Sequence, residues 1–314
     1  MTVRLAVVGV GHMGRFHAQK AGALSGVELV AVVDLDPDRA AEVAAEVGAR
    51  PAGDLTAIAA DVDAAVVAVP TVAHAAVVDE ALSCGLDVLV EKPIAATLEE
   101  AEKLLTRARE RGRVVQVGHL EWFNEAMQTA AERIDRPVFV ESHRLGPFPN
   151  RATDVDVVRD LMIHDLDLIQ RVVGAEPERI EAIGVPVITE RVDIANARLT
   201  FPSGCVANVT ASRVSPQPMR RLRFFQADGY LSIDLLERQV TLATRGAADD
   251  SGQRPIQLEQ LSIDRGDALE AQLHSFCEGV RTREIAAGAA DQGLAALRTA
   301  LRVIEAMPAL DPLE

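Results

Sequence analysis

Two patterns of hydrophobic positions divide this chain. Up to about residue 118, short continuous apolar runs alternate with stretches in which apolar residues recur every three to four positions. Such runs are typical of parallel strands buried on both faces, and the longer spacing is typical of amphipathic helices. The expected strands are Arg4–Val8, Glu28–Val33, Ala64–Val69, Asp87–Val90 and Val114–Val117, and the expected helices are Met13–Ala23, Pro37–Val47, Thr71–Cys84 and Leu98–Arg111. This order predicts a Rossmann-type, doubly wound parallel sheet.

Beyond residue 118 the pattern changes to alternating apolar and polar residues, typical of antiparallel strands with one covered face. The expected strands are Ile180–Val187, Ile194–Phe201, Cys205–Arg213, Arg220–Gln226, Tyr230–Asp234 and Gln239–Ala243, and the expected helices are Val155–Val173, Ala268–Arg281 and Gln292–Ala306. We therefore predict a Rossmann domain over residues 1–118 and an α+β domain with an open, mainly antiparallel sheet over residues 119–314. Because an open sheet leaves one face uncovered, we expect that face to pack against another subunit in a homodimer or homotetramer. We also expect the second domain to bind the substrate.

Composition excludes several classes of protein. The 314 residues carry a net charge of −15 without any Lys/Arg-rich run, which argues against a nucleic-acid partner. The chain shows neither a signal peptide nor an apolar run long enough to cross a membrane. Its three scattered cysteines (Cys84, Cys205 and Cys277) suggest neither a disulfide framework nor a zinc site. We therefore expect a cytoplasmic protein without a membrane partner or a bound metal.

A glycine-rich turn, Gly9-Val10-Gly11-His12-Met13-Gly14, follows the first expected strand and opens the first expected helix. In this setting the glycines permit a tight turn, close approach to a pyrophosphate and close helix–strand packing, and the helix N-terminus attracts the phosphates. Twenty residues later, Asp34 ends the second expected strand, where a carboxylate can accept hydrogen bonds from the ribose hydroxyls of NAD. The motif predicts NAD as the cofactor, although Arg39 lies close enough in sequence to leave NADP open.

Two groups of residues can supply catalytic chemistry. Lys92 follows the fourth expected strand, at the edge where ligands bind in open α/β sheets. Asp160 and His164 stand at positions i and i+4 and are expected on one helix face, and Asp167 could orient the imidazole. A neutral imidazole beside a carboxylate is a plausible general base near neutral pH. A metal site built on the same residues is the competing interpretation, but a second histidine at ligand spacing is missing.

Together these motifs resemble the Gfo/Idh/MocA oxidoreductases. The resemblance rests on the glycine turn, Pro70-Thr71-Val72-Ala73-His74, Glu91-Lys92-Pro93 and Asp160-x-x-x-His164, and it extends over nearly the whole chain. It implies that Lys92, Asp160 and His164 form the catalytic set. It also implies that the cofactor cleft is lined by Pro70, Thr71, His74, Glu91 and Lys92, in addition to Gly9, Gly11, His12, Met13, Gly14 and Asp34. A cis peptide bond is expected at Lys92–Pro93.

Within this family the sequence is most similar to dehydrogenases that oxidise C3 of UDP-N-acetylglucosamine in lipid A diamino-sugar synthesis. The similarity is carried by residues 117–124, 141–148 and 153–158, with one departure: Trp122 stands where the family has arginine. We interpret Trp122 as a core residue rather than a stacking partner. The expected substrate contacts are Lys92, Asn124, His143, Arg144, Asp160 and His164. Arginine forks suit the two phosphates of a UDP group, and the candidates are Arg144, Arg151, Arg159 and Arg213.

Three other functions remain open from the sequence. An inositol-dehydrogenase-like enzyme would act on a free cyclitol or hexose and would need no phosphate-binding arginines. A non-catalytic NAD-binding sensor could use the same fold, but it would have no need of Lys92, Asp160 and His164 together. A metal-dependent hydrolase would use His164 and its neighbouring carboxylates. The sequence leaves the exact sugar, the direction of the reaction and the size of the oligomer undetermined.

Overall fold

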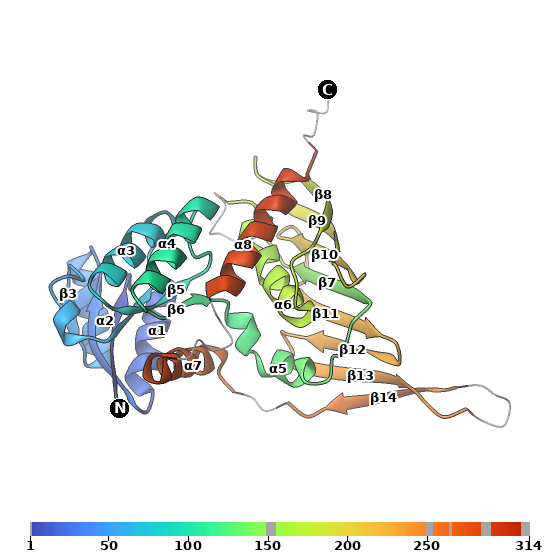
Figure 1. The fold of residues 1–314 in the computed structure, drawn as a ribbon, viewed down its shortest axis with the longest axis horizontal. Helices are drawn as coiled ribbons and strands as arrows, with labels where there is room; N and C mark the ends of the chain where they lie inside the picture. Colours follow the sequence, from blue (N-terminus) through green and yellow to red (C-terminus); the bar gives the residue numbers. More distant parts are fainter. Residues whose placement is uncertain (1, 149–154, 249–253, 264–265, 284–289, 309–314) are drawn as a thin grey trace. The chain divides into compact units, whose positions relative to one another are not determined.

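The computed structural model describes residues 2–148, 155–248, 254–263, 266–283 and 290–308 (Figure 1). The chain forms two compact units, one of Met1–Phe123 with Asp267–Leu294 and the other of Asn124–Gly266 with Ala295–Glu314. The sequence pattern placed all residues after 118 in the second domain, whereas a later segment packs with the first unit. The reason is hydrophobic: Leu273, Phe276 and Cys277 are buried in the same core as Val3 and Leu5.

The first unit is a Rossmann domain, as predicted. Its six parallel strands have the order β3-β2-β1-β4-β5-β6, so the order in which the chain adds strands reverses between β1 and β4. The strands are β1 Val3–Val8, β2 Val27–Val33, β3 Arg50–Ala52, β4 Ala64–Val67, β5 Asp87–Glu91 and β6 Val115–Gly118. The helices are α1 His12–Ala23, α2 Pro37–Val47, α3 Thr71–Ser83, α4 Leu98–Glu110 and α7 Ala268–Thr282, with short 3₁₀ turns at Ala59–Asp61 and Leu120–Phe123.

Local sequence signals explain where these helices start. Asp36 accepts hydrogen bonds from the first turn of α2, with Pro37 as its first residue. Thr97 and Glu100 form a reciprocal capping box at the start of α4. Asp267 caps α7 in the same way as Asp36 caps α2. By contrast, β3 was not predicted, because three residues that include a proline carry no hydrophobic pattern.

The second unit is built on one eight-stranded sheet with the order β14-β13-β12-β11-β7-β10-β9-β8. The pair β7–β10 is parallel and the other pairs are antiparallel, which confirms the predicted, mainly antiparallel α+β fold. The strands are β7 Phe139–Leu145, β8 Arg179–Val185, β9 Ile194–Thr200, β10 Val206–Ser212, β11 Met219–Gln226, β12 Gly229–Asp234, β13 Gln239–Arg245 and β14 Ile256–Leu261. The helices are α5 Glu125–Ala131, α6 Ile163–Val173 and the later part of α8 Ala290–Glu305.

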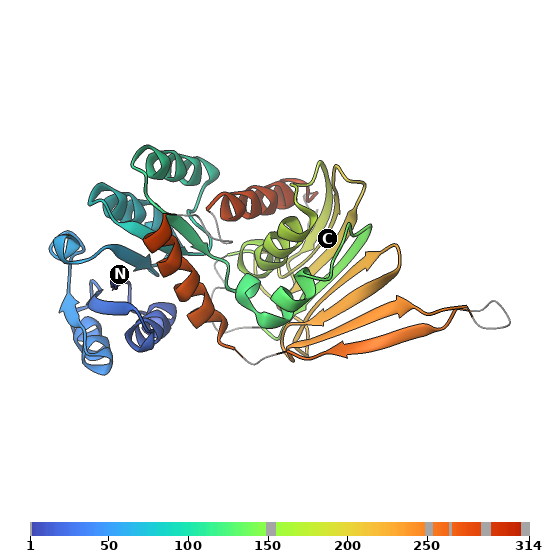
Figure 2. The same ribbon diagram turned by 60° about the horizontal axis from the view of Figure 1, so that its bottom comes forward.

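Helices α5 and α6 lie against one face of this sheet (Figure 2). The helix expected from Val155 to Val173 starts later than predicted, with a π-helical turn over Val158–Met162 that leads directly into α6. Asp156 causes the late start, because its carboxylate accepts the backbone N–H of Arg159 at 2.9 Å in the manner of an N-cap. A π-turn has about one more residue per turn than an α-helix, and such turns often occur at functional sites.

Candidate dinucleotide site and catalytic residues

Each glycine of the turn between β1 and α1 has its own steric reason. Gly9 has φ +81°, and a Cβ there would lie 2.7 Å from Val69 Cγ1. A Cβ on Gly14 would collide with the carbonyl oxygen of Gly9. At Gly11, a Cβ would meet no described atom within 4 Å, so this position faces open space. The first and third glycines therefore close the turn, and the second leaves its backbone accessible to a ligand.

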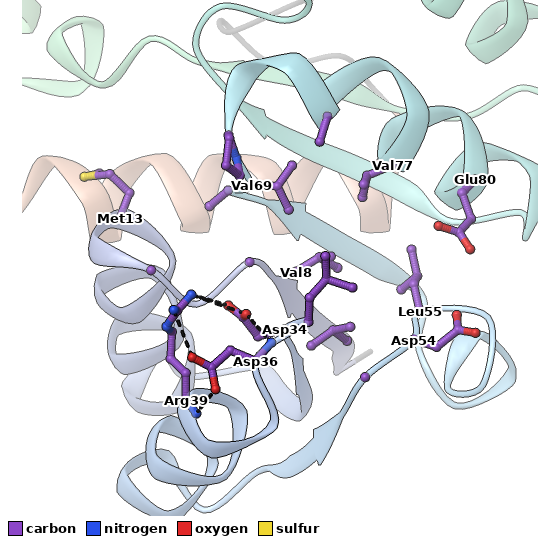
Figure 3. A pocket seen from close by; sticks show the side chains of 18 of the residues that line it. Val8, Met13, Asp34, Asp36, Arg39, Asp54, Leu55, Val69, Val77 and Glu80 are labelled. Carbon is purple, nitrogen blue, oxygen red and sulfur yellow. Dashed lines mark hydrogen bonds and ion pairs between the residues drawn. The ribbon is translucent and has the colours of Figure 1, made fainter. Parts of the chain in front are cut away.

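A pocket of about 1050 Å³ opens beside this turn (Figure 3). It lies at the carboxyl ends of β1, β2 and β4, and its volume is at the top of the usual range for small-molecule sites, roughly 300–1,000 Å³. No side chain of the described residues caps the N-terminus of α1 and no acidic residue occupies its first turn, so its N–H groups suit an anion. Of the expected cofactor residues, those that line the pocket are Gly9, Gly11, His12, Met13, Asp34 and Pro70.

Asp34 presents a fixed carboxylate to this pocket. Its Oδ2 accepts the backbone N–H of Val10 at 2.9 Å, and its Oδ1 accepts that of Asp36 at 3.0 Å. Arg39 Nη1 lies 3.4 Å from both oxygens, and half of the arginine side chain is exposed. A carboxylate has about four acceptor sites, and the two backbone N–H groups take two of them. Two ribose hydroxyls would replace the two long contacts to Arg39, whose side chain is half-exposed. The glycine turn, the helix N-terminus and this carboxylate together fit a dinucleotide.

His74 lies behind the pocket rather than on its lining. Only 1% of the residue is exposed, with Nδ1 2.7 Å from the Pro93 carbonyl oxygen and Nε2 2.9 Å from that of Val69. Burial lowers the pKa of His74, against the opposing effect of the two carbonyls. The imidazole therefore connects the loop after β4 with the loop after β5. Thr71, the first residue of α3, is likewise absent from the pocket lining.

The loop after β5 contains Lys92. The Lys92–Pro93 peptide bond is cis, which confirms that prediction. Glu91, expected to line the cofactor cleft, forms a hydrogen bond instead with His17 of α1, whose Nε2 lies 2.7 Å from Oε1. His17 is fully buried and was not identified from the sequence. Its position three residues after Gly14 was the available signal, since one turn later along a helix brings a side chain back to the same face.

Asp160 and His164 lie on consecutive helical segments of the second unit. Asp160 is within the π-turn and His164 is in the first turn of α6, and both side chains are half-buried. The expected shared face is compatible with this geometry, because the π-turn has more than four residues per turn. Asp167, considered as a partner for the imidazole, accepts a hydrogen bond from Arg171 Nε at 2.8 Å.

Two expected substrate contacts on β7 point in opposite directions. Arg144 faces α6 and forms two hydrogen bonds with Asp165, at 3.0 and 2.8 Å, while both side chains are nearly fully buried. His143 is its neighbour on the strand and lies beside Arg221 on the other face. Successive residues of a strand always alternate in this way. One chain therefore cannot present both side chains to the same ligand.

Two of the remaining candidates, Asn124 and Arg213, also have structural partners. Asn124 is buried, and its Oδ1 accepts the N–H of Ala126 as the cap of α5. Arg213, which is 1% exposed, donates to Asp193 at 2.8 Å and to the Val155 carbonyl at 2.8 Å. Arg159 keeps 41% of its side chain exposed. Arg151 lies outside the described residues, and Trp122 is half-buried in a 3₁₀ turn.

Neither a metal cluster nor a membrane span is found in the part of the chain that the structure describes. No group of three His, Cys, Asp or Glu side chains there is arranged to hold a metal ion. None of the helices formed by those residues is both long and apolar enough to cross a membrane.

Comparison with known proteins matches both units to one family. Residues 3–119 match the oxidoreductase family with an NAD-binding Rossmann fold, and residues 128–232 match the GFO/IDH/MocA C-terminal domain. The chain is also 40% identical, over 91% of its length and 95% of the relative's, to the UDP-N-acetylglucosamine 3-dehydrogenase of Acidithiobacillus ferrooxidans. The chain belongs to the Gfo/Idh/MocA family. It is therefore an NAD-binding oxidoreductase, as the motifs predicted.

Solved structures of family members agree with this assignment. The Acidithiobacillus ferrooxidans UDP-N-acetylglucosamine 3-dehydrogenase has a TM-score of 0.91 and 38% identity, with 98% of each chain covered. Among more distant relatives, the scyllo-inositol 2-dehydrogenase (NAD(+)) of Bacillus subtilis is 29% identical over 79% of both chains. A myo-inositol dehydrogenase structure from Sinorhizobium meliloti, with 23% identity and a TM-score of 0.81, has the same fold.

Proposed function

We propose that this enzyme oxidises the C3 hydroxyl of UDP-N-acetylglucosamine to the 3-keto sugar, with NAD as the cofactor. The observation that carries the proposal is the 40% identity over 91% of the chain to a dehydrogenase of that specificity, which spans both units. The similarity therefore includes the second unit, which we expect to bind the substrate. A relative that resembled only the Rossmann domain would support the choice of cofactor but not the choice of substrate.

The proposed catalytic set is Lys92, Asp160 and His164. His164 takes the C3 hydroxyl proton on an imidazole nitrogen. The Lys92 ammonium donates a hydrogen bond to the same oxygen and stabilises the negative charge that develops there. Asp160 balances the positive charge of this set. When bound, NAD supplies the hydride acceptor at nicotinamide C4, so loss of the C3 hydride and the hydroxyl proton leaves a ketone.

The arginines considered as phosphate ligands differ in burial and in their ion-pair partners. Arg144 and Arg213 each hold a buried carboxylate, and removing either from its partner would leave a buried charge unpaired. Arg159 is the better candidate, because it is 41% exposed and stands next to Asp160 in the π-turn. We therefore propose Arg159 as a partner of the UDP phosphates and assign Arg144 and Arg213 structural roles.

The substrate is tested by comparing UDP-N-acetylglucosamine with myo-inositol. Purified enzyme is incubated with NAD and each compound, and NADH is followed by its absorbance. We expect NADH only with the nucleotide sugar, and stronger thermal stabilisation by that compound in the presence of NAD. Turnover of myo-inositol alone would favour the second candidate, a cyclitol dehydrogenase, which the 29% identity to the Bacillus subtilis enzyme supports.

We further propose a homodimer or homotetramer that forms through the uncovered sheet face, and a place in lipid A diamino-sugar synthesis in the cytoplasm. The side chains of Ile183 and Val185 alternate toward that face, and the residues are 50% and 38% exposed. Phe139, Phe225 and Tyr230 form an aromatic row on the same face, with centroids 5.6 and 5.1 Å apart. Apolar surface of this kind favours association. Sedimentation as a monomer at micromolar concentration would contradict the oligomer.

A further inference from the structure

A buried pair of side chains joins the helix of the dinucleotide turn to the lysine loop. His17 belongs to α1 and is fully buried, and its Nε2 lies 2.7 Å from Glu91 Oε1. Glu91 is the last residue of β5 and directly precedes Lys92. Only 15% of its side chain is exposed. A carboxylate in such a position is costly to bury unless it is hydrogen-bonded, so this contact fixes both partners.

The contacts around His17 and Glu91 determine which of the two side chains donates the hydrogen bond. The carboxylate can only accept, so His17 donates from Nε2, and its Nδ1 has no hydrogen-bond partner among the described residues. Gly118 of β6 makes room for the acid: a Cβ there would lie 3.0 Å from Glu91 Cα and 3.1 Å from Oε2. The carboxylate therefore lies against bare backbone on one side and the imidazole on the other.

The other end of the loop is held as firmly. His74 of α3 lies 2.7 Å from the carbonyl oxygen of Pro93, which directly follows Lys92. Thus Lys92 stands between two anchored residues, each tied to a buried histidine of a different helix. The titratable groups that face Glu91 are His17 from α1, His74 from α3 and Lys92 itself.

We propose that His17 and Glu91 are positioning residues for Lys92, which fix its loop relative to α1 and keep its side chain an ammonium ion. The inference rests on the catalytic role proposed for Lys92. Burial alone would raise the pKa of Glu91, but the hydrogen bond from His17 and the charge of Lys92 help to outweigh it and hold that pKa below its ordinary value. Glu91 thus provides a negative charge that stabilises the ammonium form of Lys92. The ammonium group in turn stabilises the alkoxide charge that develops on the substrate.

The chain offers a direct test, because its only lysines are Lys20, Lys92 and Lys103. With ¹³C-labelled lysine, the Cε resonances of the unliganded enzyme can be titrated one by one, and Lys92→Arg assigns the Lys92 signal. In Glu91→Gln we expect the Lys92 midpoint to fall by about 1 pH unit, since a neighbouring carboxylate stabilises the charged form. Lys103 provides an internal reference, because its midpoint should not change.

Asp63→Asn is the matched control, because Asp63 also pairs with a cation, Arg4, in the same unit but away from the pocket. It should lower stability without moving the Lys92 midpoint. An unchanged Lys92 midpoint in Glu91→Gln, equal to that of the control, would overturn the proposal. The measurement needs no substrate, so a midpoint that moves in an enzyme inactive toward UDP-N-acetylglucosamine would refute the proposed function and leave the electrostatic inference standing.

The role of His17 is tested by two variants. His17→Leu removes the donor, and His17→Gln restores an N–H group near the same place. We expect kcat to fall at least tenfold in the leucine variant with little change in the KM for NAD, and to recover in part in the glutamine variant. Equal losses in both variants, or a loss confined to KM, would contradict a positioning role. If the leucine variant does not fold, the glutamine variant alone decides. A wild-type Lys92 midpoint and a near-normal kcat in that variant would support the role of the donor. Loss of activity in that variant would refute it.

Discussion

Asp34 and Val10 are joined by a hydrogen bond of 2.9 Å that ties the end of β2 to the glycine turn. The same carboxylate that faces the cofactor pocket therefore also shapes the turn that receives the phosphates. A ligand that contacts Asp34 is aligned with the N-terminus of α1 at the same time. This relationship makes Asp34 the most informative position for the cofactor half of the site.

Asp34→Ser should weaken NAD binding about tenfold, because hydrogen bonds to a charged acceptor contribute roughly 1.5–3 kcal/mol. The loss of negative charge beside Arg39 should also shift the relative preference toward NADP. Fluorescence titrations with both cofactors measure this. Asp38→Asn, an exposed neighbour on α2, serves as the control and should bind NAD as the wild type does. A variant that still rejects NADP as strongly as wild type would show that Asp34 does not select the cofactor.

Gly11→Ala and Gly14→Ala should fail in different ways. The extra methyl group at Gly11 meets no described atom within 4 Å, so the protein should keep its melting temperature while NAD binding is lost. At Gly14 the methyl collides with the backbone of Gly9, so we expect a loss of about 3 kcal/mol or more in unfolding free energy. Thermal unfolding and NAD titration of both variants separate the two effects. Normal NAD binding by Gly11→Ala would refute the close approach of a ligand there.

Lys92→Met should lower turnover about 10²-fold or more while NAD binding is retained. The substitution keeps most of the side-chain volume and removes the donor that stabilises the substrate oxygen. Steady-state kinetics and a cofactor titration on the same preparation provide the two readouts. Lys103→Met on α4 is the matched control and should leave turnover unchanged. Near-normal turnover of Lys92→Met would remove this lysine from the mechanism.

Asp193 should stabilise the second unit in a pH-dependent way. Burial would raise its pKa, but hydrogen bonds from the backbone of Val187, Ile188 and Thr189 and from Arg213 hold that pKa well below its ordinary value. A carboxylate with a depressed pKa contributes its full stability above its unfolded pKa, about 3.9, and loses it as the pH falls toward the folded value.

Asp193→Asn should therefore cost about 3–5 kcal/mol at neutral pH, since it leaves Arg213 buried without its partner. Urea unfolding of wild type and variant from pH 7 to about pH 3 measures the difference. The difference should shrink below about pH 4, where the wild-type carboxylate begins to lose its advantage over the unfolded state. A difference that stays constant over this range would show that the charge of Asp193 does not stabilise the fold.

Long hydrophobic runs made most of the fold predictable. The strands β1, β2, β4, β5 and β6 are nearly continuous Val, Ala and Leu, and each lies within a few residues of its expected position. Two strands that were missed lack such a continuous run: β3 has three residues, and β14 has only three apolar residues among its six and is mostly exposed. β7 has alternating residues, but its polar positions include the buried Arg144 and Ser142, so its pattern does not separate a covered face from an open one.

The site was predictable where backbone chemistry dictates the residue type. Glycine turns and a carboxylate at the end of β2 follow from steric and hydrogen-bonding rules that operate over a few positions. The roles of Arg144, Arg213 and Asn124 could not be predicted, because each depends on a partner distant in sequence or on a helix start that the pattern did not reveal. His17 was missed for the same reason, since Glu91 is 74 residues away.

The central claim is oxidation at C3 of UDP-N-acetylglucosamine, and deuterium at that carbon tests it most directly. The enzyme is given NAD and UDP-N-acetylglucosamine that carries deuterium only at C3, and both products are analysed by mass spectrometry and NMR. We predict that the deuterium is transferred to nicotinamide C4 of the reduced cofactor and is absent from the keto sugar. Reduced cofactor without deuterium, together with a sugar product that retains it, would contradict the claim.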